Sequence, residues 1–165
     1  MKDKWATLST CGLYRWVLGR SWTDRPPRFA LWVMLNPSTA DHEQDDPTIR
    51  RCMNFGEAFG FGGILVVNLY AWRATNPRDL KGATDPVGFQ NDFYIKTMAE
   101  RAEMVICAWG QSGPQPGRPA AVLELLRIYA GAKIHTMGFR QNGGPRHPLM
   151  LPKETRPERA EGWQP

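Results

Sequence analysis

Polar side chains of three chemical kinds follow directly on an apolar run near residue 36. Residues 29–35 are too few for a helix of usual length and rich in large apolar side chains, which indicates a buried strand. The strand stops before Pro37, because proline has no amide hydrogen to donate to a sheet. Asn36, Ser38 and Asp41 then bring an amide, a hydroxyl and a carboxylate to the strand's carboxyl end, where open α/β sheets bind ligands. An Asn-Pro turn with a helix-capping hydroxyl explains the same residues equally well.

Two further polar groups stand out later in the chain. Asn68 breaks the apolar pattern of residues 64–70, and His147 precedes a proline in a polar loop. Histidine exchanges protons near neutral pH, so His147 is a candidate acid or hydrogen-bond donor, although a histidine in such a loop is often only a surface residue. His42, soon after the first turn, is the competing candidate. His135 lies inside an apolar run and is expected to be structural.

The elements that must position these groups alternate between strands and helices. Strands are predicted at residues 13–18, 29–35, 64–70, 104–109 and 133–137, helices at about 47–59, 89–102 and 119–129, and a proline-containing loop at 20–28. Asp46 can cap the first helix, and Pro47 suits its first position. This alternation is typical of a parallel sheet with helices on both faces. We therefore predict an α/β fold with three layers, α/β/α, around a central, mainly parallel sheet. The loops after residues 35, 67, 108 and 137 would converge at one edge.

The length of the chain favours a single domain. Its 165 residues suit one hydrophobic core. We predict a domain over residues 1–165, with a core at about 12–152 and a charged, solvated tail at 153–165 in which Trp163 has no assigned part. No apolar run approaches the roughly 20 residues of a membrane span, and the amino terminus lacks the apolar segment of a signal peptide. A cytoplasmic location without membrane contact is expected.

Charge and cysteine content bear on partners and cofactors. The net charge of +5 and the pI near 9.4 favour a polyanionic partner, although many basic proteins bind no nucleic acid. Cys11, Cys52 and Cys107 are odd in number and widely separated, so neither a disulfide framework nor a closed metal site is indicated. We expect buried or partly buried thiols, no metal and no cofactor.

Four sequence blocks occur in an order similar to the signature blocks of the uracil-DNA glycosylase superfamily. They are residues 34–38, 66–73, 105–110 and 147–148. The chain also resembles, more closely and over most of its length, the DUF1643 family. That resemblance lies in Leu-Asn-Pro-Ser-Thr-Ala-Asp at 35–41, Asp-Asp-Pro-Thr at 45–48, Asn-Leu at 68–69 and the Gly-Pro and His-Pro-Leu segments of 144–149. Together the resemblances imply a single domain with a uracil-DNA glycosylase-like fold.

The resemblance also implies roles for the polar residues at the sheet edge. Asn36 would position or activate the attacking water, Asn68 would hydrogen-bond a flipped base, and His147 would face the departing base oxygen. These residue types fit, because cleaving an N-glycosidic bond needs a placed water and stabilisation of both the sugar cation and the base anion. The base must also leave the stack. Side chains that could stack on it are Tyr70, Trp72 and Trp109, and cations that could hold phosphates are Arg73, Arg140, Arg146 and Lys153. Core packing for the aromatic residues and a solvated position for the cations are the alternatives.

Two departures from the superfamily affect the expected chemistry. The most efficient uracil-removing members have Asp-Pro where this chain has Asn36, so slow hydrolysis, or help from a nearby carboxylate, is expected. The carboxylates that could assist are Asp41, which we favour, Asp45 and Asp46. Ser38 stands where the uracil-specific branch carries a tyrosine that blocks five-substituted pyrimidines, so room for an enlarged base is expected. Branches with an iron-sulfur cluster use four cysteines, more than this chain has.

The sequence thus predicts a monofunctional DNA glycosylase, an N-glycosyl hydrolase that flips a modified pyrimidine out of double-stranded DNA and leaves an abasic site. The preferred substrate is hydroxymethylated or glucosylated cytosine of phage DNA, the preferred context is antiviral defence, and a monomer is expected. Three alternatives stay open. They are a repair enzyme for uracil or mismatched thymine, a non-catalytic nucleic-acid-binding module, and an enzyme that acts on free nucleotides or nucleosides.

Overall fold

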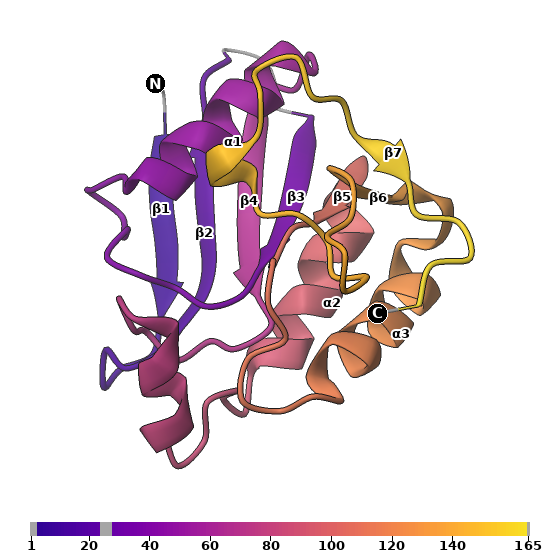
Figure 1. Cartoon of the computed structure of the whole chain (residues 1–165). Coiled ribbons are helices and arrows are strands. Elements are labelled where there is room, and N and C mark those ends of the chain that lie inside the picture. The colour runs from indigo at the N-terminus through magenta and orange to yellow at the C-terminus, as the bar shows by residue number, and fades with distance from the viewer. Residues whose placement is uncertain (1–2, 24–27, 165) are drawn as a thin grey trace.

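The computed structural model describes residues 3–23 and 28–164, and the described chain forms an α/β fold around a seven-stranded sheet (Figure 1). The strands are β1 (Asp3–Leu8), β2 (Arg15–Ser21), β3 (Phe29–Met34), β4 (Gly63–Asn68), β5 (Met104–Cys107), β6 (Ile134–Thr136) and β7 (Glu158–Arg159). The α-helices are α1 (Pro47–Ala58), α2 (Asn91–Arg101) and α3 (Arg118–Tyr129), and the 3-10 helices are η1 (Pro77–Gly82), η2 (Gly131–Lys133) and η3 (Pro148–Met150). The predicted α/β class is confirmed.

The sheet is mixed rather than mainly parallel. Its strand order is β1-β2-β4-β3-β5-β6-β7. The four central strands are parallel, since β3 pairs in parallel with β4 and β5, and β5 with β6. β2 runs antiparallel to β1 and β4, and β7 runs antiparallel to β6. The sequence did not indicate β1 and β7, because these margin strands are partly or fully exposed and lack the apolar runs of the central strands.

Both faces of the central strands are apolar. Alternate residues of a strand point to opposite sides of the sheet, and here both sets of residues are apolar. Residues Leu31, Val33, Leu65 and Val67 share a buried cluster with Ile95 of α2 and Leu123 of α3. Residues Trp32, Met34, Ile64 and Val66 share a second cluster with Ile49 and Phe55 of α1. Burial on both faces explains why these strands read as continuous apolar runs rather than alternating ones.

The first α-helix begins as its sequence predicts. Asp46 Oδ1 accepts a hydrogen bond from Ile49 N at 2.8 Å, and Pro47 occupies the first turn. The helices predicted at 89–102 and 119–129 are found as α2 and α3 with slightly shifted ends. Within the loop predicted at 20–28, the first two residues belong to β2, and Pro26 and Pro27 lie outside the described residues.

The carboxyl-terminal segment lies along the edge of the sheet, and most of its residues are exposed, as expected of a solvated tail. β7 pairs with β6, and the ring of Trp163 lies 5.4 Å from that of Trp109 and 5.3 Å from that of Phe139 between centroids. Trp163 Nε1 donates a hydrogen bond to Gly143 O at 3.1 Å. The charge of this segment suggested solvation, but Trp163 gives it an apolar anchor and β6 gives it a strand edge.

The chain leaves β3 and β5 in opposite directions. From β3 it passes through α1 to β4 on one side, and from β5 it passes through α3 to β6 on the other. Such a switch point opens a crevice beyond the carboxyl ends of the two adjacent strands, and α/β proteins bind ligands there. The residues that follow β3 and β5 therefore have the position expected of a site.

Candidate active site

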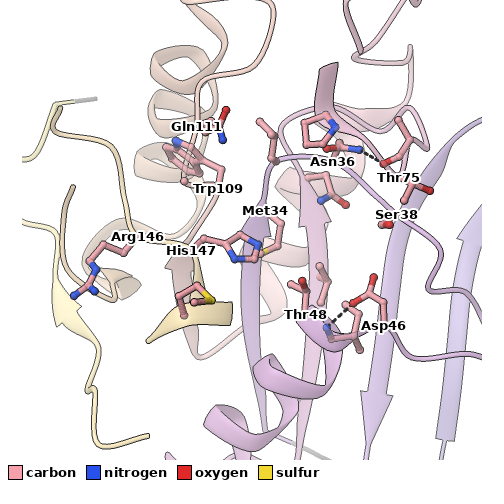
Figure 2. Close-up of a pocket in the computed structure, with 18 of the residues that line it drawn as sticks. Met34, Asn36, Ser38, Asp46, Thr48, Thr75, Trp109, Gln111, Arg146 and His147 are labelled. Carbon is pink, nitrogen blue, oxygen red and sulfur yellow. Dashed lines mark hydrogen bonds between the residues drawn. The ribbon is translucent and has the colours of Figure 1, made fainter. Parts of the chain in front are cut away.

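A cavity of about 480 Å³ opens at this switch point (Figure 2). All four loops that were predicted to converge contribute to its wall, as does the start of α1. Of the predicted site residues, those that line it are Asn36, Ser38, Asn68, Trp109, Arg140, Arg146 and His147. Figure 2 shows Asn36, Ser38, Trp109 and His147 around the same space. The volume lies within the range of small-molecule sites and exceeds what a bare pyrimidine ring needs.

The amide of Asn36 is held by the backbone, with its oxygen left to accept. Its Nδ2 donates to Pro37 O at 3.0 Å and to Ala74 O at 2.8 Å, which uses both amide hydrogens. Within the described chain no hydrogen bond to Asn36 Oδ1 is found. An acceptor held in this way can orient a water molecule, but an amide has no basic site that could take the water's proton.

Arg15, the first residue of β2, is a buried cation at the cavity. Its side chain is 2% exposed, with Nη1 donating to Ala40 O at 2.7 Å and Nη2 to Asn68 Oδ1 at 3.4 Å. Burial lowers the pKa of Arg15 to about 10, so the guanidinium stays charged at neutral pH. Among the described residues, no carboxylate forms an ion pair with it and its Nε has no hydrogen-bond partner.

Asn68, at the end of β4, presents an unpaired donor. The residue is 1% exposed, and its Nδ2 has no partner in the part of the chain that the structure describes. Its backbone is fixed, because Asn91 Nδ2 donates to Asn68 O at 2.9 Å and to Leu69 O at 3.0 Å. Leaving a buried donor unpaired costs about 1–3 kcal/mol, so a ligand acceptor at this position would be stabilised.

His147 is a neutral donor whose tautomer is set by the backbone. Leu149 N donates to His147 Nδ1 at 3.3 Å, so the proton of the neutral ring lies on Nε2. Burial lowers the pKa of His147, and the nearby Asp46 opposes this shift in part. Arg51 of α1 holds the segment in place by donating to the carbonyls of Pro148 and Leu151. The ring can therefore donate to an acceptor in the cavity without being protonated.

The carboxylate at the cavity is Asp46 and not Asp41. Asp46 lines the cavity beside Thr48, and it caps α1 with one oxygen (Figure 2). Asp41, the favoured candidate from the sequence, lies outside the lining, since its Oδ1 accepts from the backbone N of Glu43 at 2.8 Å and closes a turn. Asp45 also lies outside, and it is paired with Arg20 at 2.7 Å.

The aromatic candidates divide in the same way. Trp109 lines the cavity but is only 2% exposed, and its ring lies 5.4 Å from that of Trp163 between centroids. Tyr70 is fully buried outside the lining, and its Oη donates to Ser112 O at 2.8 Å, which holds the loop after β5. Trp72 lies against Tyr14, with ring centroids 5.4 Å apart. Of the three aromatic candidates, Trp109 is thus the one that lines the cavity.

Two of the four predicted phosphate-binding cations lie at the cavity. Arg140 donates through Nη1 to Gly110 O at 2.7 Å, and Arg146 is exposed at the rim. Arg73 lies outside the lining and donates to Gly12 O at 3.2 Å, and Lys153 is exposed outside it.

Sequence reasoning missed several residues of the lining. Arg15, Thr48, Thr75 and Gln111 all line the cavity. Arg15 carried a usable signal, since it is a cation inside an otherwise apolar strand. The competing histidine, His42, is exposed outside the lining.

Residues 3–23 and 28–164 contain neither a cluster of metal ligands nor a membrane-spanning helix. No group of three or more His, Cys, Asp or Glu side chains lies close enough there to hold a metal ion. None of the helices in these ranges has the length and apolar character needed to cross a membrane. Cys52 and Cys107 are buried as expected, whereas Cys11 is exposed in the turn between β1 and β2.

Comparison with known proteins identifies a family whose function is unknown. The family model described as "Protein of unknown function (DUF1643)" matches residues 15–149. No curated protein matches the chain, and no solved structure matches it. The matched segment contains every lining residue of the cavity except Met150 and Leu151.

Proposed function

Since the chain belongs to the DUF1643 family of proteins of unknown function, we propose an activity from the chemistry of the cavity itself. The activity is that of a monofunctional DNA glycosylase, which flips a modified pyrimidine into the cavity and hydrolyses its bond to deoxyribose. The preferred substrate is hydroxymethylated or glucosylated cytosine in phage DNA, and the context is antiviral defence. One observation carries the proposal: the Asn36 acceptor, the Asn68 donor and the His147 donor surround a single cavity.

The proposed reaction uses these three groups in different parts of the transition state. A water bound to Asn36 Oδ1 attacks the anomeric carbon as the N-glycosidic bond breaks and its electron pair leaves with the base. His147 Nε2–H and Asn68 Nδ2–H donate to the base and stabilise its negative charge. The proton of the water passes to Asp46 or to solvent, because Asn36 cannot accept it. Asp46 also supports the positive charge on the sugar.

The size of the site supports an enlarged base. Ser38 lines the cavity with a small side chain, and the cavity volume of about 480 Å³ leaves space beyond a pyrimidine ring. A hydroxymethyl or glucosyl group on the five position could occupy that space. Discrimination through added volume is limited in hydrophobic pockets, but this wall also carries hydroxyl groups of Ser38 and Thr48 that can bind sugar oxygens.

The rim of the cavity supports a DNA partner. Arg146 is exposed there, and the apolar side chains of Leu149 and Met150 project into solvent, with exposed fractions of 42% and 87%. Proteins that distort a duplex commonly insert apolar side chains between bases and neutralise phosphates with arginine. We propose that Met150 fills the gap left by the flipped base.

The helices on the two faces of the central strands also support a three-layer fold like that of the uracil-DNA glycosylases.

The test is release of free base from defined duplexes. Purified protein is incubated with DNAs that carry one uracil, mismatched thymine, hydroxymethylcytosine or glucosylated hydroxymethylcytosine, and alkali cleavage and mass spectrometry detect the products. We expect release of a modified cytosine by the wild type and at least about 100-fold slower release by Asn36→Ala. Thr10→Ala, on the turn between β1 and β2 and outside the lining, is the matched control. Release of uracil alone would identify a repair enzyme, and tight binding without any release would identify a binding module.

A further inference from the structure

The hydrogen bond between Arg15 and Asn68 has a fixed direction. A guanidinium can only donate, so the atom of Asn68 that faces Arg15 must be the amide oxygen. The donor cannot turn away, because Arg15 Nη1 is also bound to Ala40 O at 2.7 Å. Rotation of the amide by half a turn would bring its NH₂ group against the guanidinium, donor against donor. Arg15 therefore settles which end of the Asn68 amide is the oxygen.

The remaining end of the amide is a donor without a partner. Asn68 Nδ2 is buried and unpaired among the described residues, and Asn91 fixes the Asn68 backbone from behind. Arg15 Nε is a second buried donor that is unpaired in the same part of the chain. Both residues line the cavity. The buried atoms of these two lining residues that lack a partner are thus both hydrogen donors.

We propose that Arg15 is a positioning residue that fixes Asn68 as a donor to ring nitrogen N3 of the base, so that the site accepts a cytosine-type base edge and disfavours a uracil-type edge. The proposal rests on the glycosylase function above. Ring nitrogen N3 of cytosine is an acceptor, whereas N3 of uracil and thymine carries a hydrogen. A free asparagine amide can turn to suit either edge, but an amide held by Arg15 meets the N3–H of uracil with its own N–H. Apposed buried donors disfavour uracil-type bases by about 10- to 100-fold.

The experiment compares two bases that differ at this edge and share the same five-substituent. One duplex carries 5-hydroxymethylcytosine and the other 5-hydroxymethyluracil at the same position, each opposite an abasic site so that base-pair strength does not contribute. Fluorescence anisotropy gives the dissociation constant, and single-turnover assays give the release rate. We expect the wild type to favour 5-hydroxymethylcytosine by 10- to 100-fold in one or both quantities.

Variants at Arg15 separate positioning from a general structural role. Arg15→Met frees the amide to rotate, so the preference should fall towards one, and Arg15→Lys should restore part of it. A merely structural role would lower both rates by the same factor and leave their ratio unchanged. Arg101→Met is the matched control, because Arg101 is exposed at the end of α2 and lies outside the lining of this cavity.

The outcomes distinguish this proposal from the one on which it rests. Equal treatment of the two bases by the wild type, or preference for 5-hydroxymethyluracil, overturns the role of Arg15 and leaves the glycosylase intact. Preference in binding without release of either base supports the role of Arg15 and overturns catalysis. Absence of both binding and release overturns both proposals.

Discussion

Strand β2 buries an arginine near each end, and the two side chains differ in their hydrogen-bond and ion-pair partners. Arg20 is 0% exposed and donates to the carboxylate of Asp45 at 2.7 Å and to the carbonyl oxygens of Gly19 at 2.8 Å and Asp41 at 2.5 Å. Arg15 has no ion pair among the described residues and keeps an unpaired Nε. Arg20 is saturated by its own protein, whereas Arg15 faces a cavity.

The difference separates structural from functional burial of charge. A buried cation without a counterion destabilises a fold, so its presence calls for another explanation. Arg20 ties β2 to the turn after β3 and thereby shapes the cavity from outside. Arg15 and the amides of Asn36 and Asn68 leave atoms unpaired at the cavity itself. On this comparison, changes at the Arg20 end should act on stability, and changes at the Arg15 end should act on activity.

The largest effect on stability is expected from replacing Arg20, whose guanidinium nitrogens all donate hydrogen bonds within the protein. Arg20→Met should lower the free energy of unfolding by about 3–5 kcal/mol, because it removes one partner of a buried ion pair and several backbone contacts. Arg15→Met should change it by about 1 kcal/mol or less, since the lost hydrogen bonds are offset by removal of a buried charge that has no direct ion pair. Urea denaturation followed by tryptophan fluorescence measures both. Equal losses of unfolding free energy in the two variants would contradict the distinction between a structural Arg20 and a functional Arg15.

Replacing Gly110, which follows β5 at the cavity, is expected to reduce stability less than replacing Arg20 does and also to slow base release. Its φ is +72°, and a Cβ placed there would lie 3.3 Å from His147 Cβ. Gly110→Ala should therefore lower the free energy of unfolding by about 1–2 kcal/mol and should also displace His147, which slows base release. Gly60→Ala is the matched control, because Gly60 has φ +80° with no atom within 4 Å of the added Cβ. Base release that is equally slow in both variants would argue against a role for the position of His147.

The comparison also shows what the sequence could and could not predict. The central strands, the α1 start and the places of Asn36 and Asn68 at strand ends followed from apolar runs and from the residues that interrupt them, whereas His147 was indicated by a His-Pro pair in a polar loop and by the resemblance. The signals for the strands and for the helix start are local, and both elements are found in the structure. β1, β7 and the docking of Trp163 depend on pairing with distant edges, which no local pattern encodes.

The misplaced site residues have the same cause. Asp41 and Asp46 follow Asn36 by five and ten residues, and only the fold shows that the nearer one closes a turn while the other lines the cavity. Tyr70 has the residue type of a stacking platform, but its hydroxyl is used to hold the loop after β5. Arg15 and Arg20 are indistinguishable by type and strand, and only their partners separate them.

A pH dependence is expected from His147, with an effect smaller than that at Gly110. Burial lowers the pKa of His147 below its usual 6.5, so the unfolded chain binds a proton more readily than the folded one. Its contribution to stability is therefore present above pH 6.5 and is lost as the pH falls from 6.5 through the folded-state pKa. Base release should be constant from pH 8 to 6.5 and fall only as the pH passes through the folded-state pKa, because a proton on Nδ1 breaks the hydrogen bond from Leu149 N that orients the ring. An NMR titration of the histidine ring protons locates the transition, with His42→Asn as the control for assignment. A His147 pKa above 6.5 would contradict the proposed neutral donor.

The smallest effect is expected from Arg146, whose guanidinium is exposed at the rim. Arg146→Ala should leave the free energy of unfolding unchanged and weaken binding to all DNA sequences by a similar factor of about 2–5 at moderate salt. Removing one phosphate contact should also reduce the slope of log K against log salt by about 1. Arg159→Ala, on β7 and outside the lining, is the matched control and should leave the slope unchanged. Anisotropy titrations from 50 to 200 mM salt, a range over which multi-phosphate contacts lose most of their affinity, measure the slope. A change in base preference without a change in slope would move Arg146 from the DNA-binding rim to the base-reading wall, beside Arg15.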